Sequence, residues 1–352
     1  MERAVARRAG ELAVLAAIAT ACTASAQEPV RAAEPARLAA HGLLIAIAAA
    51  GPRLVAVGDR GVIVLSDDRG SSWTQARYVP TQALLTGVCF LDERRGVAVG
   101  HDEVILTSDD AGRTWKRTHD APQAQRPLLD VWCGADGSVI AVGAYSAYLT
   151  SRDGGATWRE TKFTPASPGP RARQAAAGAV AEQEEAGAAG GYHLNRIVSG
   201  GGQRLYIAGE AGHLYASEDA GASWRTLASP YEGSFFGVLP LADRVLLAFG
   251  LRGHLYRSAD EGASWQPIET ATVAMLTGAA ALDSGSIAIV GLAGVVLLSH
   301  DGGRSFALVQ QADRSGLSAV LGVGGGRLAV VGEAGARAIA LEPRAAAGSA
   351  AP

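Results

Sequence analysis

Six carboxylates recur at one fixed place in a repeated octapeptide, Ser-x-Asp-x-Gly-x-Ser/Thr-Trp/Phe. The first copy runs from Ser66 to Trp73 and the last from Ser299 to Phe306. An Asp in a turn between two strands accepts hydrogen bonds from nearby backbone N–H groups, and Gly supplies the positive φ of such a turn. We therefore predict that these carboxylates are structural Asp-box residues rather than catalytic acids. They are Asp68, Asp110, Asp153, Asp219, Asp260 and Asp301.

The spacing of the octapeptides indicates a repeat architecture. Successive aspartates lie 41 to 43 residues apart, except for one gap of 66. A period of this length accommodates four short strands, the content of one propeller blade. The Trp at the end of the octapeptide is expected to bury its ring between neighbouring blades.

A second repeated element raises the number of blades to seven. Before each octapeptide, an apolar strand ends in Gly and a short loop leads to another apolar strand, as in Val57 to Gly61; the seventh copy, Val331 to Gly335, has no octapeptide after it. Glu103 and Ser146 stand where the other loops have a second Gly. The sequence therefore predicts an all-β protein: a seven-bladed β-propeller of four-stranded antiparallel blades with Asp-box turns, over residues 27–342.

The seventh repeat supplies one strand fewer than the other six. Its three strands are predicted near 317–323, 328–331 and 337–341, and the chain then runs into Pro343 and an Ala-rich tail, residues 343–352, that we expect to be disordered. An open strand edge is a liability for aggregation. We therefore expect residues 28–38 to add the missing outer strand.

The N-terminal residues have the features of an export signal. Arg3, Arg7 and Arg8 precede an apolar stretch at 12–21, and Ala24-Ser25-Ala26 is a small-x-small cleavage site. We expect residues 1–26 to be a signal peptide and the mature protein to be exported, periplasmic or, in a photosynthetic source, lumenal. A lipoprotein anchored through Cys22 is the less favoured alternative, because the position three residues before it is not Leu.

Two cysteines, Cys89 and Cys133, remain after such processing. They fall one position apart in the innermost strands of adjacent blades, so their side chains point either toward each other or apart. An oxidising compartment would allow a disulfide in the first case. The sequence leaves both alternatives open.

One segment interrupts the repeat. Residues 165–191 are rich in Ala, Gly, Pro, Gln and Glu without apolar periodicity, and we expect a flexible insertion there. The insertion joins the outermost strand of the third blade to the innermost strand of the fourth. In a propeller, such connections share a face with the short hairpin loops, whereas the Asp boxes lie on the other face.

The hairpin loops and blade connections carry the candidate partner-binding residues, because loops on a rigid scaffold are where binding residues concentrate. Tyr231, Phe235 and Arg252 are the expected anchors, since Tyr and Arg are enriched in interface hot spots. The full candidate set is Arg60, His101, Arg126, Tyr145, His193, Glu210, Tyr231, Glu232, Phe235, Arg252 and Glu333.

No catalytic, metal or cofactor constellation emerges from the sequence. A sialidase would need three arginines, a Tyr nucleophile with a Glu base and an Asp acid; Tyr231, Glu232, Arg126, Arg196 and Arg252 are present, but the Arg-Ile-Pro motif is missing. The His residues have no metal-ligand spacing, and there is no C-x-x-C motif. We expect no cofactor, no metal and no enzymatic activity, with a glycan-binding or sialidase-like glycoside hydrolase as the alternative.

The repeated Val-Gly-x-x-Gly and Ser-x-Asp-x-Gly-x-Thr-Trp elements, together with 231–237 and 250–253, resemble the photosystem II stability/assembly-factor-like Asp-box proteins over the whole mature chain. This resemblance implies a non-enzymatic assembly factor that binds a membrane-protein complex or an exported segment through one propeller face. The net charge of −3 gives no reason to expect nucleic acid. We expect a monomer whose partner is a protein, with no transmembrane segment after signal cleavage.

Overall fold

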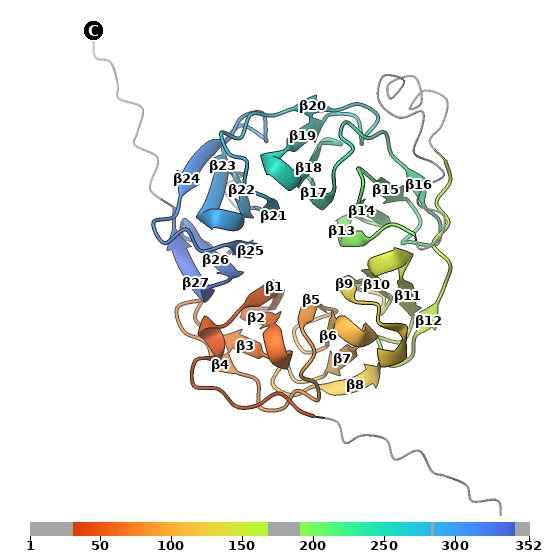
Figure 1. Cartoon of the computed structure of the whole chain (residues 1–352), viewed down its shortest axis with the longest axis vertical. Helices are drawn as coiled ribbons and strands as arrows, with labels where there is room; N and C mark the ends of the chain where they lie inside the picture. Colours follow the sequence, from red (N-terminus) through yellow and green to blue (C-terminus); the bar gives the residue numbers. More distant parts are fainter. Residues whose placement is uncertain (1–30, 168–190, 283–284, 342–352) are drawn as a thin grey trace, which may run out of the picture. The chain divides into compact units, whose positions relative to one another are not determined.

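The computed structural model describes residues 31–167, 191–282 and 285–341. The strands of this part form seven antiparallel sheets arranged in a ring, as predicted (Figure 1). Seven strands surround the axis of the ring, one from each blade. They are β1 (Leu44–Ala50), β5 (Leu85–Phe90), β9 (Leu128–Cys133), β13 (Leu194–Gly201), β17 (Phe235–Pro240), β21 (Leu276–Ala281) and β25 (Leu317–Gly322).

Each innermost strand is followed by two further strands of its blade. The second strands are β2 (Arg53–Gly58), β6 (Gly96–Gly100), β10 (Val139–Gly143), β14 (Arg204–Gly209), β18 (Leu246–Gly250), β22 (Ile287–Gly291) and β26 (Arg327–Gly332). The third strands are β3 (Ile63–Ser66), β7 (Ile105–Ser108), β11 (Tyr148–Ser151), β15 (Leu214–Ser217), β19 (Leu255–Ser258), β23 (Val295–Ser299) and β27 (Gly335–Ala340).

Six blades have a fourth, outermost strand after the Asp box. These strands are β4 (Thr74–Gln75), β8 (Lys116–His119), β12 (Arg159–Glu160), β16 (Arg225–Thr226), β20 (Gln266–Pro267) and β24 (Ala307–Gln310). The seventh blade, which has no Asp box, is a three-stranded sheet in the order β25-β26-β27.

The prediction that residues 28–38 complete blade 7 is wrong for the residues that the structure describes, 31–38. These residues form no strand and bond to blade 1 instead: Ala33 N–H donates to Val79 O at 2.8 Å, and Gln75 Nε2 donates to Glu34 O at 2.9 Å. Both hydrogen bonds hold the segment 31–38 against blade 1, beside its outermost strand. Residues 28–30 and 343–352 lie outside the described residues, as do most of 165–191 and the whole predicted signal peptide.

The remaining regular elements are short 3₁₀ turns. Two lie in connections, η1 (Ala39–His41) and η4 (Pro122–Ala124). Five form the loops between second and third strands: η2 (Asp59–Gly61), η3 (His101–Glu103), η5 (Ala144–Ser146), η6 (Leu251–Gly253) and η7 (Leu292–Gly294). Within the described part of the chain, no helix has the length and apolar character needed to cross a membrane.

The apolar core is divided among the interfaces between neighbouring blades. Trp115 of the second Asp box, which is almost completely buried, packs with Val55 of blade 1 and Leu106 of its own blade. The aromatic residues of the other five boxes contact the corresponding interface with the preceding blade. At the interface between blades 6 and 7, Ile339 and Leu341 pack where no box aromatic is present.

The two cysteines form a disulfide between the innermost strands of blades 2 and 3. The Cα atoms of Cys89 and Cys133 are 5.7 Å apart, and both residues lie near the C-terminal ends of β5 and β9. Of the two alternatives left open by the sequence, the structure shows the one in which the side chains face each other.

Candidate functional site

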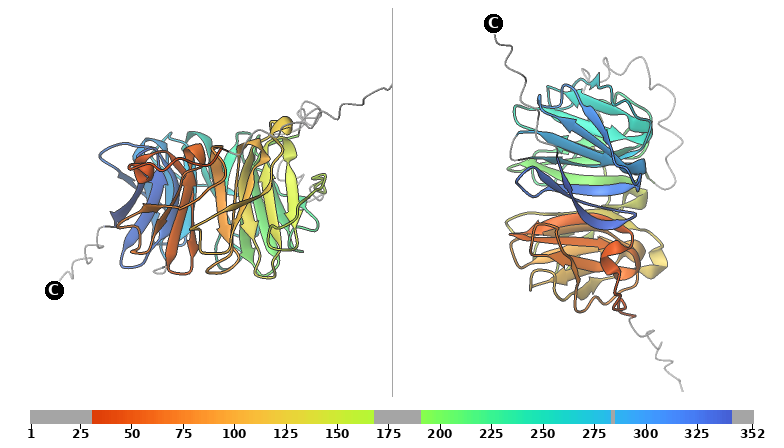
Figure 2. Two further views of the ribbon diagram at one scale, coloured as in Figure 1. Left: turned by 90° about the horizontal axis from the view of Figure 1, so that it is seen from below. Right: turned by 90° about the vertical axis from the view of Figure 1, so that its left-hand side faces the viewer.

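The strand order gives the ring two different faces, which Figure 2 shows edge-on. On one face, which we call the Asp-box face, each Asp box lies beside a loop between first and second strands; for example, Ala111 N–H donates to Arg94 O. On the other, the hairpin face, the loops between second and third strands contact the blade connections; for example, His101 N–H donates to Leu84 O. The expected partner-binding residues lie on or beneath the hairpin face.

Each Asp-box carboxylate is bonded within its own turn. In the first box, Asp68 Oδ1 accepts the Ser72 backbone N–H at 2.8 Å and the Ser66 hydroxyl at 2.8 Å, and Oδ2 accepts the Ser72 hydroxyl at 2.6 Å. Ser66 Oγ in turn accepts the Gly70 N–H. The same bonds recur in all six boxes. This is the local geometry that the sequence predicts.

These hydrogen bonds also lower the pKa of the carboxylates. The Ser72 hydroxyl and N–H lower the pKa of Asp68 to about 2, and the equivalent groups of Thr157 lower the pKa of Asp153 to about 2. Hydrogen bonds to a carboxylate stabilise its charged form, so both groups are ionised near neutral pH. A general acid requires a pKa closer to the working pH.

The hairpin face repeats one backbone shape with different side chains. The middle residue of each 3₁₀ loop is left-handed, as in Arg60 (φ 52°), Tyr145 (φ 54°) and Arg252 (φ 56°). Two backbone bonds close each loop; in η6, Gly250 N–H donates to His254 O and His254 N–H to Leu251 O. The middle side chain therefore projects from a fixed loop.

Two loops keep this shape without the second Gly. Glu103 and Ser146 have φ values of 51° and 58°, a region that non-glycine residues enter at a cost. Each makes a bond that no Gly could make: Glu103 Oε1 accepts Arg126 Nε at 2.6 Å, and the Ser146 hydroxyl donates to Tyr192 O at 3.1 Å. These bonds tie the two loops to the next blade connection.

The predicted binding residues differ in how exposed their side chains are. Six are exposed: Arg60, His101, Tyr145, Glu232, Arg252 and Glu333. Glu333 also accepts the Gly316 N–H, and the half-buried Glu210 accepts the His193 N–H. Arg126 is half-buried and bonded to Glu103 and Glu160.

Phe235 lies elsewhere than expected. Its side chain is completely buried and packs against Tyr231 and Tyr256, so a partner cannot contact it in this fold. The cause is its register: Phe235 occupies the first position of its innermost strand, where the other blades have a buried Leu. Phe235 is therefore a core residue of blade 5.

Two Tyr–His ring pairs, one stacked and one tilted, support the hairpin face of blades 4 and 5. The rings of Tyr192 and His213 are 3.9 Å apart, and those of Tyr231 and His254 are 4.2 Å apart. Burial lowers the pKa of His213, which favours its neutral form. The repeated Gly-His-Leu-Tyr at 212–215 and 253–256 is the sequence signal for these pairs, and the candidate set drawn from the sequence did not use it.

Near the axis, Arg196 links non-adjacent blades. Its Nη2 donates to Thr277 O of blade 6 at 3.4 Å, and its Nε lies 3.7 Å from Asp130 Oδ2 of blade 3. Burial raises the pKa of Asp130, which also accepts the Ile197 N–H. Arg126 and Arg196 thus pair with different carboxylates, Glu103 and Glu160 for Arg126 and Asp130 for Arg196.

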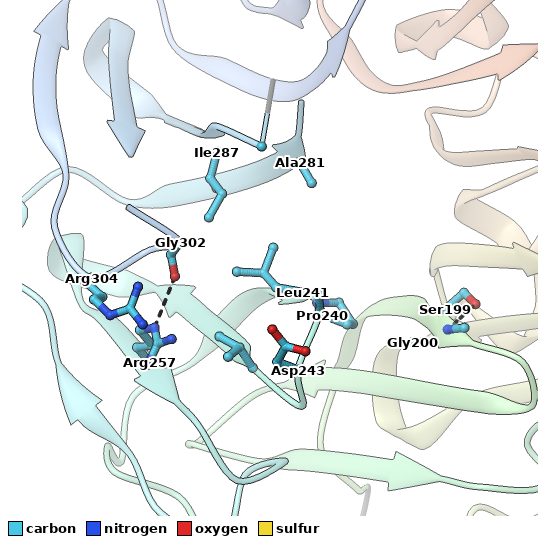
Figure 3. Close-up of a pocket in the computed structure, with 14 residues that line it drawn as sticks. Ser199, Gly200, Pro240, Leu241, Asp243, Arg257, Ala281, Ile287, Gly302 and Arg304 are labelled. Atoms are coloured by element: carbon cyan, nitrogen blue, oxygen red, sulfur yellow. Dashed lines mark hydrogen bonds between the residues drawn. The ribbon is translucent and has the colours of Figure 1, made fainter. Parts of the chain in front are cut away.

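A pocket of about 720 Å³ lies on the Asp-box face of blades 4 to 6 (Figure 3). Leu241 and Ile287 form apolar walls, and Arg257 donates from Nε to Gly302 O at 3.2 Å. Among the described residues that line the pocket, Asp243 is the single carboxylate. A glycosidase that uses a carboxylate pair needs two such groups across the scissile bond.

The described residues also give no indication of a metal site. Within 31–167, 191–282 and 285–341, no group of three His, Cys, Asp or Glu side chains is arranged to hold a metal ion. The geometry of the described residues defines a surface of exposed loops on an Asp-box propeller.

Comparison with known proteins agrees with this class. The family described as "Photosynthesis system II assembly factor YCF48" matches residues 66–191. A search of curated proteins returned no match. The chain is thus an Asp-box propeller that resembles the photosystem II assembly-factor-like proteins.

Solved structures show the same fold at low sequence identity. "YCF48 bound to D1 peptide" has a TM-score of 0.66 at 15% identity, covering 90% of this chain and 98% of that one. YCF48 from Cyanidioschyzon merolae has a TM-score of 0.65 at 16% identity, covering 87% and 96%. The GH74 xyloglucanase from Xanthomonas campestris has a TM-score of 0.58 at 18% identity, covering 85% of this chain and 52% of that one.

Proposed function

We propose that this protein is a non-enzymatic assembly factor that binds a protein partner, a membrane-protein complex or an exported segment, through its hairpin face. The observation that carries the proposal is the set of exposed side chains on closed loops, above all Arg60, Tyr145 and Arg252. Preorganised loops lose little conformational entropy on binding, so more of the contact energy appears as affinity. Tyr and Arg also combine a large contact area with directional hydrogen bonds.

The comparisons support a protein partner. One structure with this fold is YCF48 in complex with a D1 peptide, so a propeller of this kind can hold a polypeptide segment. The GH74 xyloglucanase shares the fold as well, so the fold alone does not exclude an enzyme and the side chains must decide. The Asp-box carboxylates are used within their turns, and the pocket has a single described carboxylate.

We further propose an exported, periplasmic location. The N-terminal sequence has the features of a signal peptide, and the Cys89–Cys133 disulfide is of a kind that persists in oxidising compartments. Fractionation of cells that express the full chain tests this location. Recovery of the protein in the cytoplasm with free thiols would refute it.

Co-purification tests the function. The full-length protein is captured from solubilised envelope and compared with the Tyr145→Ala/Arg252→Ala double variant. We expect the double variant to lose the co-purifying membrane protein while keeping its melting temperature. Asp109→Ala, an exposed change on the Asp-box face, is the matched control and should retain the partner.

Hydrolytic activity is the competing outcome. If the purified protein released sugar from envelope glycans, and the Asp243→Asn variant lost that activity, the proposal would be replaced by the glycosidase alternative. Capture of the same membrane protein by the double variant and the wild type would also refute the hairpin face as the binding surface.

A further inference from the structure

Blade 7 differs from the other blades in a way that leaves backbone groups exposed. In blade 6, β24 covers β23 through four residue pairs, from Val295↔Gln310 to Leu298↔Ala307. In blade 7, no described strand pairs with the outer side of β27. The equivalent of the fourth strand is missing among residues 31–167, 191–282 and 285–341.

The pairing of β27 with β26 shows which groups are free. Gly332 pairs with Gly335, and Leu341 N–H donates to Gly326 O at 2.7 Å. Because hydrogen-bonded and outward-facing residues alternate in an antiparallel pair, Ala336, Ala338 and Ala340 direct their N–H and C=O groups to the open edge. Within β27 there is no Lys, Pro or bulge of the kind that normally protects an exposed strand, and its one charged residue, Arg337, is paired with Asp313.

Exposed apolar side chains gather beside the same edge. Among the described residues, seven large apolar side chains are exposed, and three of them lie next to blade 7. Val309 belongs to β24, the outermost strand of blade 6, which Figure 1 shows as the neighbour of β27 on the rim; it pairs with Val296, which packs at the interface of blades 6 and 7. Leu38 and Leu43 flank η1, which contacts β27.

We propose that the outer edge of β27 takes up an extended, uncharged segment of a partner protein as the fourth strand of blade 7. The backbone groups of the three alanines would supply the hydrogen bonds of strand addition. Their small side chains leave room for β-branched or aromatic residues opposite them, and Val309 supplies apolar contact on the side of blade 6.

The surroundings of the edge favour this occupant over others. Arg337, the charged residue of β27, is already paired with Asp313 at 3.1 Å, so the edge offers a charged segment no free partner within β24 and β27. A second copy paired through one short strand would bury much less than the roughly 800 Å² per partner that is typical of a stable interface. A single extended segment of a partner protein can bind through its own strand pairing, without a large interface from the rest of that protein.

Binding of a labelled peptide tests the proposal. The probe is a fluorescein-labelled peptide with the sequence of residues 305–312, which contains the outermost strand of blade 6. We expect saturable binding to the full-length protein by fluorescence anisotropy. Ala338→Pro removes an edge N–H without touching the ladder to β26, and should weaken binding about tenfold or more.

Two controls separate strand addition from other effects. Val273→Ser removes a more exposed apolar side chain far from blade 7 in the sequence, and should leave peptide binding unchanged. The same peptide N-methylated at every residue from 306 to 311 has no N–H group on either edge, so it cannot complete the ladder and should not bind the wild type, whatever the stability of Ala338→Pro. Equal binding of both peptides, or no saturable binding of the unmodified one, would overturn the proposal.

The test also distinguishes this site from the hairpin face and from self-association. The Tyr145→Ala/Arg252→Ala variant should bind the peptide as the wild type does, so failure of the proposed function would not affect this result. Sedimentation should show a monomer. A dimer that dissociates on Ala338→Pro would assign the edge to a second copy instead, and would refute the partner segment.

Discussion

The two faces of the ring are built from the same repeat but differ in which side chains are the same in every blade. On the Asp-box face, the same Ser, Asp and Gly groups bond to one another in six blades, and both oxygens of each carboxylate accept hydrogen bonds within the turn. On the hairpin face, the loops share a left-handed middle residue whose side chain changes from Arg60 to Tyr145 to Arg252. Constant side chains build the scaffold, and under the proposed function varied side chains on a constant backbone would supply recognition.

The largest effect that this comparison predicts is on the disulfide, at the Asp-box end of the innermost strands. Replacing Cys89 and Cys133 together by Ser should lower the free energy of unfolding by about 2–4 kcal/mol, because the bond closes a long loop in the unfolded chain. Urea unfolding of the oxidised wild type and the double variant measures this difference. Partner capture by the folded variant should be unchanged; loss of capture by the variant while it is still folded would contradict the division between the faces.

A smaller loss is expected when one Asp box is broken. Asp110→Ala removes the acceptor for the Thr114 N–H and hydroxyl and for the Ser108 hydroxyl, and should cost about 1–3 kcal/mol. The adjacent Asp109, whose exposed side chain is paired only with Lys116 at 3.2 Å in the described structure, is the control; its replacement by Ala should cost at most about 0.5 kcal/mol. Equal effects at the two positions would show that the box bonds do not stabilise the turn.

The boxes also predict how stability depends on pH. The folded pKa of Asp68 and of Asp153 is about 2, below the value of about 3.9 in an unfolded chain. The unfolded state therefore binds protons first, and the stabilisation, complete above about pH 5, is lost progressively as the pH falls toward 2. Urea midpoints measured from about pH 5 down to about pH 2 should fall steeply over this range. A flat profile would show that the carboxylates are not held as the structure places them.

The smallest stability effect is expected on the hairpin face. Arg252→Ala removes an exposed side chain that makes no hydrogen bond or ion pair with the described residues, and should change the free energy of unfolding by less than about 0.5 kcal/mol. Thermal unfolding of the variant and of Asp110→Ala, measured side by side, checks the contrast. A loss as large as that of the box variant would mean that this loop is part of the scaffold.

The sequence predicted the repeated parts of the fold well. The Asp boxes and Gly-bounded hairpins are local signals, so the number of blades, the strand order and the two faces could be derived without tertiary information. Residues that interrupt a repeat were harder to place. Residues 31–38 looked available for blade 7, yet their bonds to Val79 and Gln75 depend on a path across blade 1 that no local pattern encodes.

Side-chain placement at the candidate site shows the same limit. Phe235 stands beside loop residues in the sequence, but its register in β17 turns it into the core. The disulfide could not be decided either, because a one-residue offset between β5 and β9 is compatible with facing or opposed side chains. In both cases the direction of the side chain depends on the register between neighbouring blades. The sequence of a single blade does not determine that register.

The measurement that tests the central claim most directly is site-specific photocrosslinking on the two faces. A photoreactive phenylalanine analogue is placed at Tyr145 or Arg252 on the hairpin face and at Arg113, which is exposed on the Asp-box face. After irradiation of intact cells, we expect one covalent adduct with the same membrane protein from positions 145 and 252, and none from 113. An adduct from 113 alone would contradict the account and assign recognition to the Asp-box face.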